Sequence, residues 1–141
     1  MTTPSTAALR IPVALELLVD DMRLGRGQNT HHKGWQGTAA QVKRERAQLN
    51  WALSRKWIGI MPGDVGPFRA AAGPGPWSVT LTRVAPSAGL DAHDNLSASF
   101  KALVDELARW LGVDDRNPRV RWQYAQERGP WAVRIRIEEV A

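Results

Sequence analysis

The stretch LDAHDNLSASFKALVDELARWLGVDD, Leu90 to Asp115, decides the fold. Its large apolar residues follow one another at offsets of 4, 3, 4 and 4, the spacing of one face of an α-helix. Gly112 comes directly after the last of them, where helices favour glycine. This spacing predicts an amphipathic helix that ends near Leu111, and its buried face consists of Leu96, Phe100, Leu103, Leu107 and Leu111.

Four stretches on either side of this helix alternate apolar and polar residues, which predicts β-strands. They are residues 10–19, 77–86, 119–126 and 131–140, and ERGP between the last two predicts a β-hairpin. A second helix is expected from about Trp35–Thr38 to Trp57, because apolar residues recur there at the helical period.

The remaining stretches are predicted to be irregular. Residues 1–9 are small and polar, as in a loose tail, and residues 59–76 are dominated by Gly, Pro and Ala, which predicts a surface loop. The expected fold class is therefore α+β, a single domain over residues 1–141. Its mixed β-sheet carries two packed helices in the order β-α-β-α-β-β.

Composition bounds the partners of the chain. Lys and Arg outnumber Asp and Glu by 19 to 14, a formal charge of +5, so a polyanionic partner is favoured. The sequence has no cysteine, which excludes disulfides and thiolate metal sites and suits a reducing compartment. The apolar run IPVALELLV is too short to span a bilayer and contains Glu16, so no membrane association is expected.

Acidic residues bracket the central helix of this basic chain. Asp91 and Asp94 precede it, and either can cap its free N–H groups, but a cap accounts for one acid only. Asp114 and Asp115 follow its carboxyl end, where negative charge is unfavourable against the helix dipole. That placement is the first indication of a functional site.

Lys101 and Asp105 extend the acidic pattern along the helix. On one continuous helix, residues 94, 101 and 105 lie within about 40° of one another, opposite the apolar face. A solvated face has the same appearance, so the stripe alone does not define a site. Should the two acidic clusters approach within about 4 Å, their repulsion of order 4 kcal/mol at an effective dielectric of 20 favours a bound cation. Mg²⁺ or Mn²⁺ is the natural occupant of an all-oxygen site.

With these residues in place, the sequence resembles the RusA family of Holliday-junction resolvases, especially its phage-encoded branch. That family carries a D-x-D-N signature before a helix, a K-x-x-x-D pair on the helix, a D-D pair before a strand, and a glycine near a final turn. The matching residues here are Asp94, Asn95, Lys101, Asp105, Asp114, Asp115 and Gly129. The match covers roughly residues 81–140.

Two positions depart from the family pattern. Ala92 stands where the first acid of D-x-D-N is expected, so Asp91 and His93 are the alternative candidates for that ligand. Lys101 lies seven residues after Asp94 instead of four, which keeps the same helical face but shifts it about 4.5 Å along the axis.

The resemblance implies a homodimeric, Mg²⁺-dependent endodeoxyribonuclease, with Mn²⁺ as a second possible ion, that cuts paired strands at branched DNA. Asp94 and Asp115 are the leading metal ligands it implies, Asp91 is the third, and Lys101 contacts a phosphate. Asp105 either orients Lys101 or touches metal. Asp114 has three possible roles: it caps a chain end, orients a neighbouring group or ligates the metal. A phage or prophage protein of this kind works in the cytoplasm of a bacterial host.

Basic residues of the amino-terminal half are candidate DNA contacts, with plain solvent exposure as the alternative. They are Lys33, Lys43, Arg44 and Arg46. The arginines of the last two strands are a second candidate DNA-binding surface. Trp51 and Trp57 are interpreted as dimer contacts in preference to a wedge against bases. The competing functional hypothesis is a DNA-binding or assembly protein on the same fold, with a site too altered at Ala92 to hold metal. A third and weaker functional hypothesis is a nuclease that prefers flaps or other branched DNA to four-way junctions.

Overall fold

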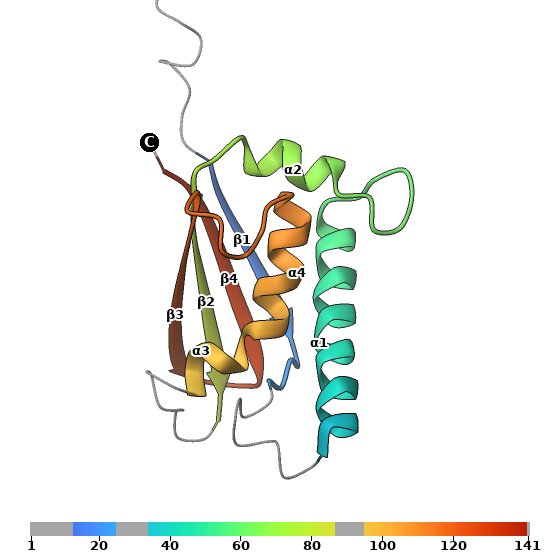
Figure 1. Cartoon of the computed structure of the whole chain (residues 1–141), viewed down its shortest axis with the longest axis vertical. Coiled ribbons are helices and arrows are strands. Elements are labelled where there is room, and N and C mark those ends of the chain that lie inside the picture. Colours follow the sequence, from blue (N-terminus) through green and yellow to red (C-terminus); the bar gives the residue numbers. More distant parts are fainter. Residues whose placement is uncertain (1–12, 25–33, 87–94, 141) are drawn as a thin grey trace, which may run out of the picture.

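The computed structural model describes residues 13–24, 34–86 and 95–140, without the side chains of residues 34–38 and 95. The described residues form four strands and four helices (Figure 1). In chain order they are β1 Ala14–Asp20, α1 Gly34–Lys56, α2 Gly66–Ala72, β2 Trp77–Ala85, α3 Asn95–Ser99, α4 Lys101–Leu111, β3 Val120–Arg128 and β4 Ala132–Glu139. The α+β class and the mixed sheet with packed helices are confirmed, but the number of helices is larger than predicted.

The sheet has the strand order β1-β4-β2-β3. β4 pairs antiparallel with both β1 and β2, and β2 pairs in parallel with β3. One face is apolar and lies under the helices, with Val79, Leu81, Val133, Ile135 and Ile137 buried. Thr80, Thr82, Arg134 and Arg136 point to the other face, which no described helix covers.

The predicted hairpin of the last two strands is wrong, because β2 lies between them. The short link after β3 crosses the end of β2, where the Gly129 N–H donates to the Ala85 carbonyl at 3.1 Å. A Cβ at Gly129 would lie 2.9 Å from Cγ1 of Val84, so this close crossing requires glycine. Alternation reports which face of a strand is buried but not which strand is its neighbour, and that is why the hairpin was predicted.

The predicted surface loop of residues 59–76 contains helix α2, which corrects the sequence-based expectation. Pro67 occupies its first turn, where the missing N–H costs nothing, and three alanines follow Arg69. Phe68 is fully buried and packs edge-on against Trp57 at 5.1 Å and Trp110 at 5.6 Å between ring centroids. A short helix with one large anchoring side chain has too little periodicity to be read from the sequence.

The central helix is interrupted at Phe100, which separates α3 from α4. Phe100 is fully buried and stacks on Tyr124, with ring centroids 5.6 Å apart. Just before it, the Ser99 hydroxyl donates to the Leu96 carbonyl at 2.6 Å, a local bond of the kind that competes with helix continuation. The expected apolar face is confirmed, since Leu96, Leu103, Leu107 and Leu111 are all buried. The predicted polar stripe from residue 94 to Lys101 is not confirmed, because the helix that would carry it is not continuous.

The core lies between the sheet and the helices, with α1 packed beside α4 and also in contact with β1 (Figure 1). Eight of the eleven residues of α4 are buried, so this helix is held on most of its circumference. No helix among the described ranges is long and apolar enough to cross a membrane. A rigid α4 is the platform for the side chains considered next.

Candidate active site

Asp115 lies beside the first residue of α4, although it follows the last residue of that helix by four positions. The connection between α4 and β3 turns back along the helix (Figure 1). Lys101 Nζ donates to Asp115 Oδ2 at 3.0 Å and to Asp105 Oδ1 at 3.0 Å. The Trp122 indole N–H donates to the Asp115 carbonyl at 2.9 Å and anchors this connection to β3. Three residues of the predicted site therefore meet.

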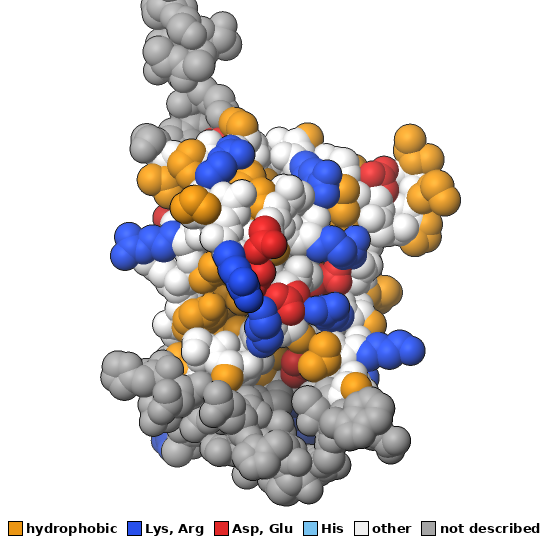
Figure 2. Space-filling model, in the orientation of Figure 1, with side chains coloured by type: hydrophobic (Ala, Val, Ile, Leu, Met, Phe, Trp, Pro, Cys, Tyr) orange, Lys and Arg blue, Asp and Glu red, His pale blue; other side chains and the backbone are white. Residues whose placement is uncertain are grey.

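A fourth residue, Arg46 of α1, extends this group through Asp105. Its Nη2 lies 3.0 Å from Asp105 Oδ2, so each oxygen of that carboxylate has its own cation. We name the four residues Arg46, Asp105, Lys101 and Asp115 the charged network. It carries two positive and two negative charges and is formally neutral. Figure 2 shows acidic and basic side chains interleaved in the middle of the face that carries α4.

The acidic side chains of the network are less exposed to solvent than the Lys101 side chain. The side chains of Asp105 and Asp115 are 27% and 28% exposed, whereas that of Lys101 is 67% exposed. Ion pairs this accessible contribute about 0–1 kcal/mol each to stability, so the fold does not depend on them. The carboxylates are held in place while the ammonium group stays accessible to a ligand.

The network fixes the charge states of its central residues. The hydrogen bond from Lys101 lowers the pKa of Asp115 below its ordinary range. Hydrogen bonds to Asp105 first and to Asp115 second raise the pKa of Lys101 above its ordinary value. Since the carboxyl pKa falls and the ammonium pKa rises, both groups are charged throughout the neutral pH range.

Asp114 shapes the turn that carries Asp115, and its hydrogen bond to the Asp115 side chain adds to the larger lowering of the Asp115 pKa by Lys101. Asp114 is exposed, its Oδ1 accepts the Arg116 N–H at 2.8 Å, and its carbonyl accepts the Asn117 N–H at 3.0 Å. Of the roles proposed for Asp114, the described contacts favour orientation of the turn.

The carboxyl end of α4 is stabilised by Arg69 of α2. Its guanidinium donates to the Trp110 carbonyl at 2.8 Å and to the Arg109 carbonyl at 3.0 Å. A cation at this end of a helix is the favourable arrangement. The two acids that follow α4 do not occupy that position, because the chain turns at Gly112 and carries Asp115 back towards Lys101. Their apparent conflict with the helix dipole is thus removed by the fold, and their meeting with Lys101 is the better indication of a site.

Four predicted site residues, Lys33, Asp91, His93 and Asp94, lie outside the described residues. The expected approach of Asp91 and Asp94 to Asp115 stays a prediction. Within the described part of the chain, no group of three or more His, Asp or Glu side chains is placed to hold a metal ion. Asp115 offers oxygen of the kind that Mg²⁺ prefers, but a complete donor set requires Asp91 and Asp94 as well.

The basic side chains of α1 that are predicted to contact DNA lie on two different faces of the helix. Lys43 and Arg46 are exposed and lie three residues apart on α1, so they share a face beside Asp105. Arg44 is exposed on another face and bonds to Gln41, which in turn bonds to the Arg23 carbonyl. Of the three, Arg46 belongs to the network and Lys43 lies on the same face of α1.

Two of the strand arginines are paired with carboxylates. Arg134 pairs with Glu127, and Arg136 pairs with both Glu16 and Glu138. These pairs neutralise two of the four candidate arginines, whereas the Arg119 guanidinium bonds to the Pro74 carbonyl. The expectation that the strand arginines form a floor for DNA stays a prediction.

Sequence reasoning missed Tyr124, which lies beside the network. Its ring stacks on Phe100, the residue before Lys101, and burial raises the pKa of its hydroxyl. The charges of Lys101 and Asp115 also act on that pKa in opposite directions, which places the hydroxyl within their electrostatic reach. In the alternating stretch 119–126, Tyr124 falls on the same side as Val120 and Trp122, and nothing in the sequence distinguishes a core tyrosine from one at the edge of a site.

Comparisons with known proteins do not identify this chain. No protein-family model matches it, and no curated protein matches it.

Proposed function

We propose that this protein is a metal-dependent endodeoxyribonuclease of the RusA-like type, which hydrolyses phosphodiester bonds at four-way or otherwise branched DNA. The observation that carries the proposal is the meeting of Lys101, Asp105 and Asp115, which match the family's motifs and come from both ends of α4. A solvated helix face explains Lys101 with Asp105, four residues apart. It does not explain why the chain returns to place Asp115 on the same ammonium group.

Asp115, Asp94 and Asp91 are the proposed metal ligands, with His93 as the alternative to Asp91. A bound Mg²⁺ or Mn²⁺ would activate a water molecule and stabilise charge on the phosphate oxygens. Asp115 suits this role because its pKa is lowered and it is ionised at neutral pH. Asp105 has two cations of its own and is better suited to orienting Lys101 than to ligating metal.

Lys101 is the proposed phosphate contact. An ammonium group has three donors, and two of them are used by Asp105 and Asp115. The third is available to a phosphate oxygen, because the side chain is largely exposed. Asp105 holds Lys101 from the next turn of the same helix, so the ammonium position is fixed before the substrate arrives. Such preorganisation is what electrostatic stabilisation of a transition state requires.

Branched DNA and a second copy of the chain are the proposed partners. Arg46 of the network and Lys43 share one face of α1, and the net charge of +5 favours a polyanion. Lys33, which lies outside the described residues, and Arg44, on another face of α1, are further proposed phosphate contacts.

The proposal is tested by incubating the purified protein with three labelled substrates: a synthetic four-way junction, a flap and a linear duplex. Each is assayed with Mg²⁺, with Mn²⁺ and with a chelator. We expect cleavage of the junction that requires a divalent ion, with little cleavage of the linear duplex. Metal-dependent cutting of all three at equal rates would contradict branch selectivity, and cleavage that persists in chelator would contradict the metal-dependent mechanism.

One observation favours the competing function, a DNA-binding or assembly protein without catalysis. Lys101 and Arg46 already neutralise both described carboxylates of the network, and Ala92 stands where a ligand was expected. Junction binding in the same panel, without cleavage under any ion, would establish that alternative.

A further inference from the structure

The connection between α1 and α2 exposes large apolar side chains close together. Ile60 is 97% exposed, Ile58 78% and Met61 71%, and Trp51, near the end of α1, is 61% exposed. All four line one hollow of the surface. An exposed apolar group of this kind marks an interaction site.

Specific contacts hold this connection in place. The Asp64 carboxylate accepts the Ile60 N–H at 3.2 Å through Oδ2 and the Gly66 N–H at 3.0 Å through Oδ1. A Cβ at Gly59 would lie 2.5 Å from Asp64, so the turn requires glycine there. Both oxygens of Asp64 are therefore used to shape the connection, and the backbone presents Ile60 and its neighbours to the surroundings.

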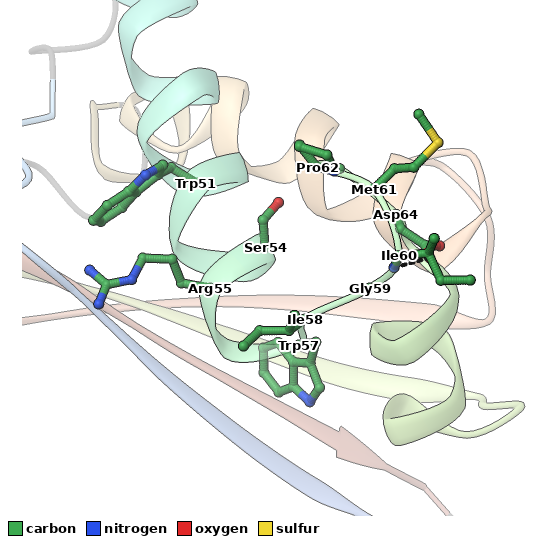
Figure 3. Close-up of a pocket in the computed structure, with 11 residues that line it drawn as sticks. Trp51, Ser54, Arg55, Trp57, Ile58, Gly59, Ile60, Met61, Pro62 and Asp64 are labelled. Atoms are coloured by element: carbon green, nitrogen blue, oxygen red, sulfur yellow. Dashed lines mark hydrogen bonds between the residues drawn. The ribbon is translucent and has the colours of Figure 1, made fainter.

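The hollow has a volume of about 410 Å³ and lies between the end of α1 and the connection. Figure 3 shows Trp51 and Arg55 side by side at one end, Met61 and Pro62 at the other, and Ser54 directed into the space between them. We name this hollow and the exposed side chains around it the α1–α2 patch. Its two ends differ, because one combines an aromatic ring with a cation and the other is apolar.

Arg55 is a cation that the α1–α2 patch can offer to a partner. Its guanidinium lies over the Trp51 ring, 4.6 Å from the ring centroid. Among the described residues, no carboxylate forms an ion pair with Arg55. The neighbouring Lys56 is directed elsewhere and bonds to the Glu16 carbonyl of β1. Stacking on an aromatic ring orders a guanidinium and leaves its N–H groups available to a carboxylate.

The charges of the α1–α2 patch favour an acidic and apolar protein segment over a nucleic acid. Arg55 and Asp64 are the two charged residues of the lining, and the Asp64 carboxylate is already bonded to backbone N–H groups. Phosphate binding requires several cations, and the lining provides one. A carboxylate for Arg55 together with apolar side chains for the hollow uses both features of the patch.

We propose that the α1–α2 patch binds a short extended segment of a different protein, in which carboxylates lie next to large apolar side chains. A carboxylate of the segment meets Arg55 beside Trp51, and the apolar side chains enter the hollow towards Pro62. Arg55 follows Arg46 of the charged network by nine residues (55 − 46), roughly 13 Å along α1, so the bound segment leaves the network open. This docking function goes beyond the nuclease proposed above, because it needs neither metal nor DNA.

The test uses two fluorescein-labelled peptides in a glycine–serine frame. One carries a pair of glutamates followed by a pair of leucines, and the other has glutamines in place of the glutamates. Fluorescence anisotropy with the full chain should give a dissociation constant of about 100 μM or tighter for the acidic peptide and roughly 10-fold weaker binding of the glutamine peptide. The indole N–H resonance of Trp51, assigned with Trp51→Phe, should shift in NMR spectra when the acidic peptide is added.

Two variants separate the contributions of charge and apolar contact. Arg55→Gln should weaken binding of the acidic peptide roughly 10-fold and leave the glutamine peptide unchanged, whereas Ile60→Ser should weaken both peptides. Arg128→Gln and Leu18→Gln, at exposed positions of the sheet strands, are the matched controls and should bind as the wild type does. Since all four side chains are exposed, the melting temperatures should stay unchanged.

Four outcomes would overturn the proposal. The first is no binding of the acidic peptide up to about 1 mM, and the second is equal affinity of the two peptides for the wild type. The third is an affinity that neither Arg55→Gln nor Ile60→Ser reduces, which places the peptide elsewhere. The last is a different occupant of the patch: a second copy, if the molar mass in solution falls in Ile60→Ser, or DNA, if Arg55→Gln loses junction binding.

Discussion

At the scale of single residues, Lys101 has the central position. Its ammonium group links Asp105, four residues away, to Asp115, fourteen residues away. The first pair was predictable from helical spacing. The second was suggested only by motif resemblance, because no periodicity predicts that a connection will turn back along its helix. Tyr124 was not predicted, since burial and proximity to a site have the same sequence pattern in a strand.

Lys101→Met removes the ammonium group and keeps most of the side-chain length. We expect the pKa of Asp115 to rise towards the ordinary value of about 3.9, because its principal hydrogen-bond donor is lost. Carboxyl carbon resonances followed by NMR over a pH titration measure this. Stability conferred by the lowered pKa is present above about pH 3.9 and is lost as pH falls through the folded value, so wild type and variant should converge in strong acid.

The same variant should cleave junction DNA roughly 100-fold more slowly, since one donor to a reacting oxygen is worth this much or more. Its melting temperature should change little, because the ion pairs are exposed. Lys56→Met, on the far end of α1, is the control with an unchanged rate. An unaltered pKa of Asp115 in Lys101→Met would contradict the described network.

At the scale of elements, the sequence predicted which faces are buried better than it predicted how elements connect. The apolar face of α4 and the alternation of β4 are confirmed, because burial imposes period 3.6 on a helix and period 2 on a strand. The interruption at Phe100, helix α2 and the position of β2 between β3 and β4 depend on contacts between distant residues, such as Phe100 with Tyr124 and Gly129 with Val84.

Gly129→Ala tests the crossing of β2 by the link between β3 and β4. The added methyl group meets the stiff, buried Val84, so we expect a loss of about 1–3 kcal/mol in the free energy of unfolding. In a Val84→Ala background the same substitution should cost clearly less, because the opposing methyl group is gone. Urea denaturation of the four proteins measures the coupling, and equal costs in both backgrounds would indicate that Gly129 does not lie against Val84.

At the scale of the whole molecule, the two faces differ in charge. The helical face carries exposed Lys43 beside Arg46 and Lys101 of the network, whereas Arg134 and Arg136 on the open sheet face are paired with carboxylates. The net charge of +5 was visible in the sequence, but its distribution was not. Pairing across β1, β3 and β4 depends on strand order, which the sequence did not predict.

The salt dependence of junction binding tests whether the helical face contributes more than the open sheet face to DNA binding. Lys43→Gln should reduce the slope of log affinity against log salt by about 1, the effect of one lost phosphate contact. Arg134→Gln is the matched control on the open face, and its slope should equal that of the wild type. Binding titrations by fluorescence anisotropy at several salt concentrations measure both. A larger effect of Arg134→Gln would place DNA on the open face of the sheet instead.

The most direct test of the central claim is the rate of Mg²⁺-dependent cleavage of a four-way junction by Asp115→Asn, compared with Asp20→Asn on the exposed side of β1. Loss of a metal-ligating carboxylate predicts a rate at least about 100-fold below wild type for Asp115→Asn, with junction affinity and melting temperature preserved. Asp20→Asn should cleave as the wild type does. Equal rates for the two variants would contradict the assignment of Asp115 to catalysis.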